Sequence, residues 1–399
     1  MKIGLCIRTY NPCSGGLQAH AAQLCQELLA RGHEVRVVTR SISKTPSYAD
    51  YFLYTDPVAR IAVGGSQVTV LRRPAWWRPL LWVSMKCRWR PRLARLGVAF
   101  YRRAFEPGMR AALQGVDLIH HVGQGAEMIG FAAAGAARAL RIPFIAQPTV
   151  HPGQWGDSEF DFMLYRQADR LLVHTLYEAD WFSQRLSRAM TAVVGNGIQD
   201  QSGGNAARFR KRHALQDPFV LFIGRKTADK GHPLCREAYH IVRQQRPEVA
   251  LVCMGPGVAK QPPEPGVLEL GFADESEKHD ALAACSLLCV PSEGESFGLV
   301  YMEAGRYGKP VIGRRLPVLE ELLGSEEAGL LVGTAVGAGN QVAVEPEELA
   351  NAILRVITQP ELARRLGDSA RRVSGRFVWS EVATRFEAAY RETLTSVRR

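Results

Sequence analysis

The chain has 399 residues, 46% of them hydrophobic and 22% charged, and a formal net charge of +11. This length exceeds a single ordinary core and favours two domains. The composition is that of a globular protein. No apolar run reaches the roughly 18 residues of a membrane-spanning helix. The N-terminal MKIGLCIRTY is interpreted as a buried strand, not a signal peptide. The eight scattered cysteines are expected to be reduced core residues of a cytoplasmic protein, and no Cys/His spacing suggests zinc.

The first half of the chain alternates short apolar strands with helices. Strands are expected at 2–8, 34–39, 68–72, 117–121, 142–147, 170–175 and 191–194. Helices are expected at 16–30, within the basic stretch after residue 72, and at 126–140, 160–168 and 177–186. Alternation of this kind predicts a parallel sheet covered on both faces.

A linker of glycine and polar residues covers 195–197 and 201–212, and the alternation then restarts. Further strands are expected at 219–224, 250–254, 267–270, 287–290, 311–314 and 329–332. Further helices are expected at 235–245, 276–284, 346–357, 360–373 and 379–395. The prediction is an α/β protein of two Rossmann-like domains facing across a cleft, with ligands at the carboxyl ends of the strands.

The most informative segment is PSEGESFGLVYMEAGRYGKPVIG, residues 291–313. Glu295 is expected in a loop at a helix N-terminus, and Glu303 one to two turns into that helix. Backbone N–H groups of Phe297, Gly298 and Leu299 would be free to bind an anion there. The segment therefore predicts a site that takes phosphate at one end and sugar hydroxyls at the other.

Two cations and a glycine pair add to this prediction. Arg225 directly follows an expected strand, and Lys230 comes five residues later in RKTADKG, which suits a diphosphate unless the segment is a solvated charged loop. Gly16 ends Ser-Gly-Gly before the first helix, where a backbone can approach a phosphate, although a simple tight turn explains it equally well. The pattern is not GxGxxG, which argues against NAD.

Three histidines follow strands of the first domain. His120 and His121 end the strand after Asp117, and His151 follows the strand that ends at Gln147. Neutral histidines at these positions could hydrogen-bond sugar hydroxyls or phosphate. Satisfied structural histidines are the alternative.

The positive charge is concentrated in one segment. Residues 71–110 hold eleven Lys/Arg and one acid, Glu106, so the other 359 residues sum to +1. The segment also holds four of the seven tryptophans. Peripheral contact with an anionic membrane is the preferred interpretation. A solvated helix face is the main alternative, and nucleic-acid binding is disfavoured because no recognised module is present.

Over almost its full length the chain resembles the GT-B retaining glycosyltransferases of family 4, the group 1 class. The resemblance rests on these segments: SGGLQAH, RGHEV, VVGNGI, FIGRKTADKG, GFADESEKHDALAACSLLCVPSEGESFGLVYMEAGRYGKPVI and FVWSEVATRFEAAYRETL. It implies an N-terminal acceptor-side domain at 1–195, with the C-terminal helix from about 379 to 399 packing back on it. It implies a nucleotide-sugar domain at 196–378.

The resemblance also implies residue roles. Gly16 would offer its N–H to the donor phosphate, and Arg225 and Lys230 would clamp the diphosphate. Glu295 would face the transferred sugar, and Glu303 would bind the ribose. The residues that would line the sugar and phosphate are Phe297, Gly298 and Leu299. Transfer would proceed with retention, without a metal or other cofactor.

The chain departs from the family at one point. Many relatives carry His-x-His where this chain has His120-His121-Val122, so the sugar-contacting histidine is left open among His120, His121 and His151. The expected acceptor is a glycan or lipid-linked molecule of bacterial surface synthesis at the inner membrane face. A small soluble acceptor, a nucleotide-sugar epimerase and a nucleotide-sugar-binding protein without activity are the alternatives. Residue types do not name the donor base or sugar.

Overall fold

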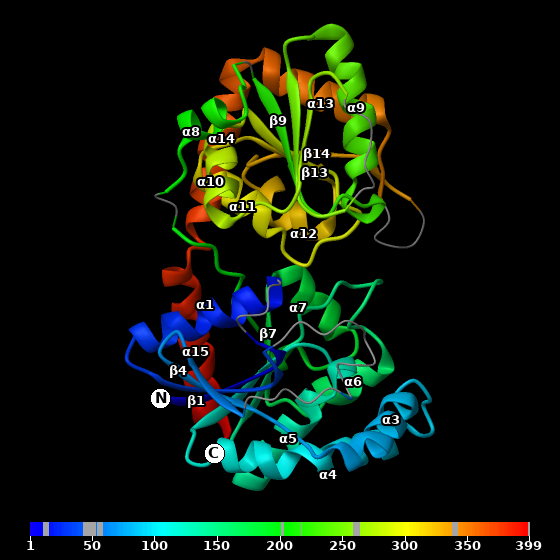
Figure 1. Cartoon of the computed structure of the whole chain (residues 1–399), viewed down its shortest axis with the longest axis vertical. Coiled ribbons are helices and arrows are strands. Elements are labelled where there is room, and N and C mark those ends of the chain that lie inside the picture. Colours follow the sequence, from blue (N-terminus) through cyan, green and yellow to red (C-terminus); the bar gives the residue numbers. More distant parts are fainter. Residues whose placement is uncertain are drawn as a thin grey trace. The chain divides into compact units, whose positions relative to one another are not determined.

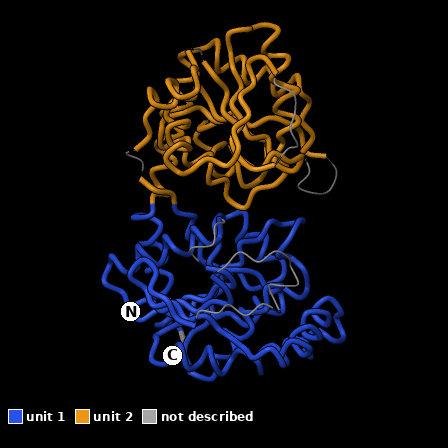
Figure 2. The backbone as a smooth tube through the Cα atoms, in the orientation of Figure 1, with its two compact units in different colours: residues 1–197, 379–399 blue, residues 198–378 orange. Residues whose placement is uncertain are grey.

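The computed structural model describes residues 1–10, 16–42, 53, 59–200, 203–216, 218–257, 264–336 and 342–397. Two compact units divide the chain (Figure 2). Unit 1 comprises Met1–Gly197 and Trp379–Arg399, and unit 2 comprises Ile198–Val378. The sequence predicts the domain boundary at residue 195, and the structure divides the units after Gly197. The C-terminal helix, which begins at Trp379, belongs to unit 1.

Unit 1 is built on an eight-stranded sheet in the order β3-β4-β2-β1-β5-β6-β7-β8 (Figure 1). The strands are β1 (Lys2–Thr9), β2 (Glu34–Ser41), β3 (Arg60–Val63), β4 (Ser66–Val70), β5 (Leu118–Val122), β6 (Phe144–Gln147), β7 (Arg170–Val173) and β8 (Thr191–Val193). All neighbours are parallel except β3 and β4. Strands β1 and β5 are buried nearly throughout, as expected for a sheet covered on both faces.

Helices cover both faces of this sheet. They are α1 (Gly16–Ala30), α3 (Arg78–Cys87), α4 (Ala94–Ala112), α5 (Ile129–Leu140), α6 (Glu159–Tyr165), α7 (Leu176–Ser183) and α15 (Trp379–Val397), with short helices η1 (Ala75–Trp77), η2 (Gly125–Glu127) and η3 (Arg188–Met190). The alanine- and glycine-rich α5 is buried from Ile129 to Ala137, because small residues let it lie close against the sheet and α4. Helix α15 is fixed to unit 1 by an ion pair between Glu387 and Arg31 at 3.3 Å.

Two local predictions for unit 1 were incomplete. The strand expected at 68–72 is the second arm of an antiparallel hairpin, β3–β4, whose turn residues Gly64 and Gly65 both have positive φ. The basic stretch is not one helix but η1, α3 and α4. Turns separate α3 from α4 around Pro91, whose missing N–H and fixed φ disfavour a continuous helix.

Unit 2 contains a six-stranded parallel sheet in the order β11-β10-β9-β12-β13-β14. The strands are β9 (Phe219–Ile223), β10 (Ala250–Met254), β11 (Val267–Leu270), β12 (Leu287–Val290), β13 (Val311–Arg314) and β14 (Leu330–Val332); β15 (Thr334–Ala335) and β16 (Val342–Ala343) form a small hairpin. The helices are α8 (Ala206–Arg212), η4 (Ala228–Lys230), α9 (His232–Gln245), α10 (Glu275–Ala284), α11 (Leu299–Arg306), α12 (Pro317–Leu319), η5 (Glu320–Gly324), α13 (Pro346–Thr358) and α14 (Pro360–Gly375).

The strand order reverses between β9 and β12. From β9 the chain proceeds to β10 on one side, and β12 joins on the other. The loops at the carboxyl ends of β9 and β12 therefore lead away in opposite directions, and ligands of open α/β sheets bind at such a switch point.

Two further observations concern composition. The seven cysteines in the described part of the chain are all buried free thiols. Across those same residues, no helix is long and apolar enough to cross a membrane.

Candidate functional site

The loops that follow β9 and β12 meet at the switch point of unit 2. The backbone N–H of Glu293 donates to the carbonyl oxygen of Asp229 at 2.9 Å, which ties the two loops together. Gly231 has φ +73°, and a Cβ there would lie 2.3 Å from the carbonyl oxygen of Pro291. Glycine is required at this position, because the loops approach more closely than any side chain allows.

This close approach brings Lys230 to Glu295. The Lys230 ammonium donates to Glu295 Oε1 at 2.8 Å, and the side chains are 19% and 12% exposed. The sequence singled out both residues, but their direct pairing emerges only from the fold. A largely buried ion pair at a loop crossing is an arrangement in which a bound anion and a sugar hydroxyl could each engage one charged partner.

Arg225 lies at the same strand end and is half exposed. Its guanidinium pairs with the Asp229 carboxylate at 2.9 Å. A hydrogen bond from the Thr227 hydroxyl, aided by Arg225 and Lys230, lowers the pKa of Asp229. The sequence does not predict a role for Asp229. Its carboxylate, four residues after Arg225, orients the Arg225 guanidinium.

The N-terminus of α11 has the predicted backbone geometry. Gly298 precedes the helix with φ +83°, and no side chain caps the first turn. Phe297 is 1% exposed and packs edge-on against Phe377, with ring centroids 4.9 Å apart. The Phe297 ring therefore belongs to the core of unit 2, so only its backbone is placed as the sequence analysis expected. Leu299 begins the helix and is partly buried.

Glu303 lies in the second turn of α11 and has a partner that the sequence did not indicate. Lys278 of α10 donates to Glu303 Oε1 at 2.9 Å and also contacts Glu275 at 2.7 Å. Burial raises the pKa of Glu303, and the attraction to Lys278 opposes that rise. Because 25 residues separate the two, no local sequence pattern could have paired them.

His120 and His121 of unit 1 do not lie on the same side of the sheet. His120 and His121 are both fully buried and, as strand neighbours, point to opposite faces. His120 Nδ1 bonds the Tyr390 hydroxyl of α15 at 2.8 Å, and His121 Nδ1 bonds the Cys6 carbonyl oxygen at 3.1 Å. Their Nε2 atoms have no partner among the described residues. One ligand cannot contact both, and both side chains are placed in the core.

His151 and Gly16 are nearer the surface of unit 1. The His151 ring is partly buried and packs on the exposed Trp155, with centroids 3.9 Å apart. Gly16 begins α1 and is exposed, and a Cβ there would meet nothing within 4 Å. Close packing is therefore not the reason for a glycine at position 16. Its neighbours Ser14 and Gly15 lie outside the described residues.

A buried polar cluster around His20 was not predicted. His20 bonds Asn196 Oδ1 at 2.7 Å and Gln147 Oε1 at 3.1 Å, and Gln147 Nε2 lies 3.1 Å from His174. These residues come from α1, β6 and the segments after β7 and β8. The sequence signals that could have indicated this cluster are Gln147 and His174 at the ends of expected strands. Burial lowers the pKa of His20 and lowers that of His174 to about 3.

Within the described ranges one group of three side chains has metal-ligand geometry. Ligand atoms of His232, Cys253 and Glu269 lie within 4.8 Å of one another. Lys226 already contacts Glu269 at 2.6 Å. Burial opposes ionisation of Glu269, but hydrogen bonds from His232 and Lys226 outweigh it and lower its pKa to about 2. Because Lys226 already supplies the positive charge beside Glu269, we interpret this group as a structural ion pair and not as a metal site.

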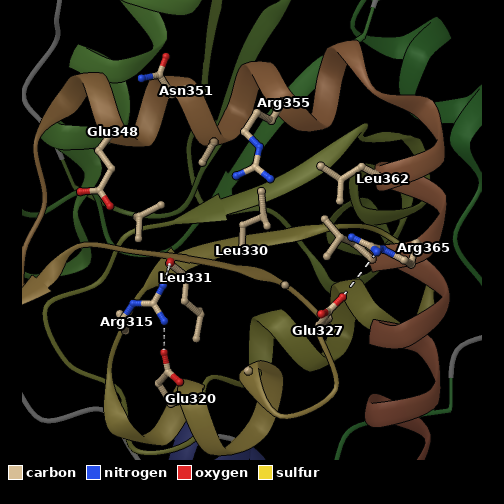
Figure 3. A pocket seen from close by; sticks show the side chains of 15 residues that line it. Arg315, Glu320, Glu327, Leu330, Leu331, Glu348, Asn351, Arg355, Leu362 and Arg365 are labelled. Carbon is tan, nitrogen blue, oxygen red and sulfur yellow. Dashed lines mark hydrogen bonds and ion pairs between the residues drawn. The ribbon is translucent and has the colours of Figure 1, made fainter.

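A separate cavity of about 580 Å³ lies beside β14, α13 and α14 of unit 2 (Figure 3). Four of its charged lining residues are paired: Arg315 contacts Glu320, and Arg365 lies 3.7 Å from Glu327. None of the residues predicted for the site lines it. We therefore interpret this cavity as a polar surface groove, distinct from the site formed by the loops after β9 and β12.

Comparison with known families covers nearly the whole chain. Residues 14–202 match the family described as "Glycosyltransferase Family 4", and residues 205–373 match "Glycosyl transferases group 1". The chain belongs to the group 1, family 4 glycosyltransferases. The family predicted from the sequence is thereby confirmed, and the residue 205–373 match contains the loops after β9 and β12.

Individual relatives of this glycosyltransferase are distant. A D-inositol 3-phosphate glycosyltransferase of Saccharomonospora viridis is 31% identical over 58% of this chain, and the match spans only 57% of that relative. A phosphatidyl-myo-inositol mannosyltransferase of Mycobacterium tuberculosis is 25% identical over 98% of this chain and 96% of its own length.

Solved structures share the fold. Sucrose-phosphate synthase from Thermosynechococcus elongatus has a TM-score of 0.69 at 21% identity, covering 99% of both chains. Anabaena HepE in complex with UDP-glucose has a TM-score of 0.69 at 19% identity, covering 99% of this chain and all of that one. These similarities and the two largely parallel sheets confirm the predicted GT-B fold class of two Rossmann-like units.

Proposed function

We propose that this glycosyltransferase moves a hexose-type sugar from a nucleotide-diphosphate sugar to a glycan or lipid-linked acceptor, with retention at the anomeric carbon. The observation that carries the proposal is the Lys230–Glu295 pair at the switch point of unit 2. A diphosphate needs fixed cations, a sugar needs a hydroxyl acceptor, and the paired loops supply both.

In this proposal Lys230 and Arg225 stabilise charge on the departing diphosphate, together with the uncapped N-terminus of α11. Glu295 accepts a hydrogen bond from the transferred sugar, and Glu303, oriented by Lys278, accepts hydrogen bonds from the ribose. Two side-chain cations make a metal unnecessary, so turnover should persist in the presence of a chelator. A donor of this class is bound by HepE in its solved complex.

A panel of nucleotide sugars tests the proposal. Thermal stabilisation by one donor, followed by acceptor-dependent release of nucleoside diphosphate, is the expected result. NMR of the product should show the same anomeric configuration as the donor. Interconversion of the free nucleotide sugar without release of nucleoside diphosphate would instead favour an epimerase.

The acceptor is proposed to bind unit 1 and to belong to bacterial surface polysaccharide or glycolipid synthesis. The inositol-phosphate and phosphatidylinositol acceptor classes in the names of the relatives support a polyol or lipid-linked molecule. Transfer to a detergent-solubilised lipid acceptor but not to free sugars would support this choice. The reverse preference would favour the small soluble acceptor.

A further inference from the structure

The basic segment at residues 71–110 forms a helical hairpin at the periphery of unit 1. Helix α3 extends outward from the beginning of α4 (Figure 1). The Ser84 hydroxyl donates to the Gly97 carbonyl oxygen at 2.6 Å, and a Cβ on Gly97 would lie 2.9 Å from the Ser84 carbonyl oxygen. Tight packing therefore holds α3 against α4, and the outward faces of both helices are fixed.

Large hydrophobic side chains are exposed along this segment. Six of the ten that are exposed in the described part of the chain lie between residues 76 and 96: Trp76, Leu80, Trp82, Trp89, Leu93 and Leu96. Trp76 is 67% exposed and Trp89 is 58% exposed. The predicted alternative of a solvated face with its aromatics in the core is wrong for these tryptophans. Such a concentration of exposed apolar residues marks an interaction surface.

The same segment is strongly basic. Of the eleven Lys/Arg at residues 71–110, eight are exposed: Arg72, Arg78, Lys86, Arg90, Arg92, Arg95, Arg103 and Arg110. The one acid, Glu106, already pairs with Arg102 at 2.6 Å. The Lys86 ammonium lies 5.5 Å from the Trp82 ring centroid, so charge and aromatic surface are interleaved. Arginines beside tryptophans match a membrane interface, where rings lie at headgroup level and cations meet phosphates.

A hollow beside α4 extends this surface. It has a volume of about 540 Å³, and three of its lining residues are Arg95, Arg102 and Arg138. The remaining lining residues, mostly apolar, are Val98, Ala99, Phe131, Met163 and Gln167. A guanidinium rim over an apolar floor suits a phosphate joined to hydrocarbon.

We infer that η1, α3 and the first turns of α4 dock this enzyme on an anionic lipid bilayer. Trp76, Trp82 and Trp89 enter the interface, and Arg90, Arg92 and Arg95 contact lipid phosphates. This docking does not rest on the donor site, because none of these residues lies in unit 2.

Sedimentation of the full chain with vesicles tests the inference. Binding to phosphatidylcholine vesicles containing phosphatidylglycerol is expected at low salt, with weak binding to phosphatidylcholine alone. Replacing Arg90, Arg92 and Arg95 with Gln should lower the partition coefficient about a hundredfold, at about fivefold for each arginine. The triple change of Trp76, Trp82 and Trp89 to Ser should lower it about tenfold or more and abolish quenching of tryptophan fluorescence by brominated lipid.

Matched changes in unit 2 serve as controls. Replacing Arg364, Arg365 and Arg372 of α14, all three exposed, with Gln alters net charge equally. This change should not alter vesicle binding, and no variant should change donor affinity in solution. Equal binding to neutral vesicles, equal loss with the controls, or binding to RNA in place of vesicles would overturn the inference. Lost donor affinity with intact vesicle binding would count against the proposed function alone.

Discussion

The ammonium group of Lys230 lies 2.8 Å from a carboxylate oxygen of Glu295, across two loops that begin at neighbouring strands. Each charge compensates the other in a largely buried setting. A nucleotide-sugar diphosphate would share the lysine, and a sugar hydroxyl would take a free carboxylate lone pair. In the proposed function, the pair would therefore link recognition of the two halves of the donor.

Replacing Lys230 with Met should lower kcat/KM by about 10²–10³, because one donor to the developing diphosphate charge is lost. The measurement is steady-state transfer with the best donor. Lys211→Met, on the exposed surface of α8, is the matched control and should leave turnover unchanged. Equal activity of the two variants would remove Lys230 from the mechanism.

Glu303→Gln should weaken donor binding about 10- to 100-fold, because a hydrogen bond to a charged group contributes about 1.5–3 kcal/mol. Calorimetric titration with the nucleotide sugar measures this. Glu275→Gln changes the other, largely exposed partner of Lys278 and should have little effect. Unaltered affinity in Glu303→Gln would contradict the ribose role.

Donor affinity should fall as pH decreases through the raised pKa of Glu303, since the protonated carboxyl is a weaker hydrogen-bond acceptor. The Lys278 charge opposes that rise, so Lys278→Met should move the acid midpoint to higher pH, and Lys278→Arg should restore it. Affinity measured across pH distinguishes this from a structural role, which would lower affinity equally at every pH.

Unit 1 should lose stability in acid. Burial lowers the pKa of His121 to about 4 and that of His174 to about 3, from an ordinary value of 6.5. The unfolded chain therefore binds protons that the folded chain excludes, and stability falls as pH decreases below 6.5. Each histidine should contribute about 1.4 kcal/mol per pH unit. Denaturant unfolding between neutral and acid pH measures the slope, which His121→Gln should reduce.

Gly197 is confined by a ring from α15. A Cβ at this position would lie 2.2 Å from the Trp379 indole, so Gly197→Ala should destabilise the fold by about 1–3 kcal/mol. Gly16→Ala, which meets nothing within 4 Å, is the control for thermal unfolding and should be near neutral. A stable Gly197→Ala variant would mean that the helix shifts at low cost.

Sequence alone predicted the α/β fold from the alternation of apolar strands and helices, and the family from its resemblance to known motifs. It also singled out Arg225, Lys230, Glu295 and Glu303 as candidates, because such patterns are local in the chain. Tertiary structure decided what depends on distant partners. Lys278 reaches Glu303 across 25 residues, His120 meets Tyr390 across 270, and the Phe297 ring turns into the core. It also decided which tryptophans face outward, since the break at Pro91 and the Ser84–Gly97 contact fix the exposed faces of α3 and α4. Local sequence sets which side chains are present, but only packing sets which of them remain accessible.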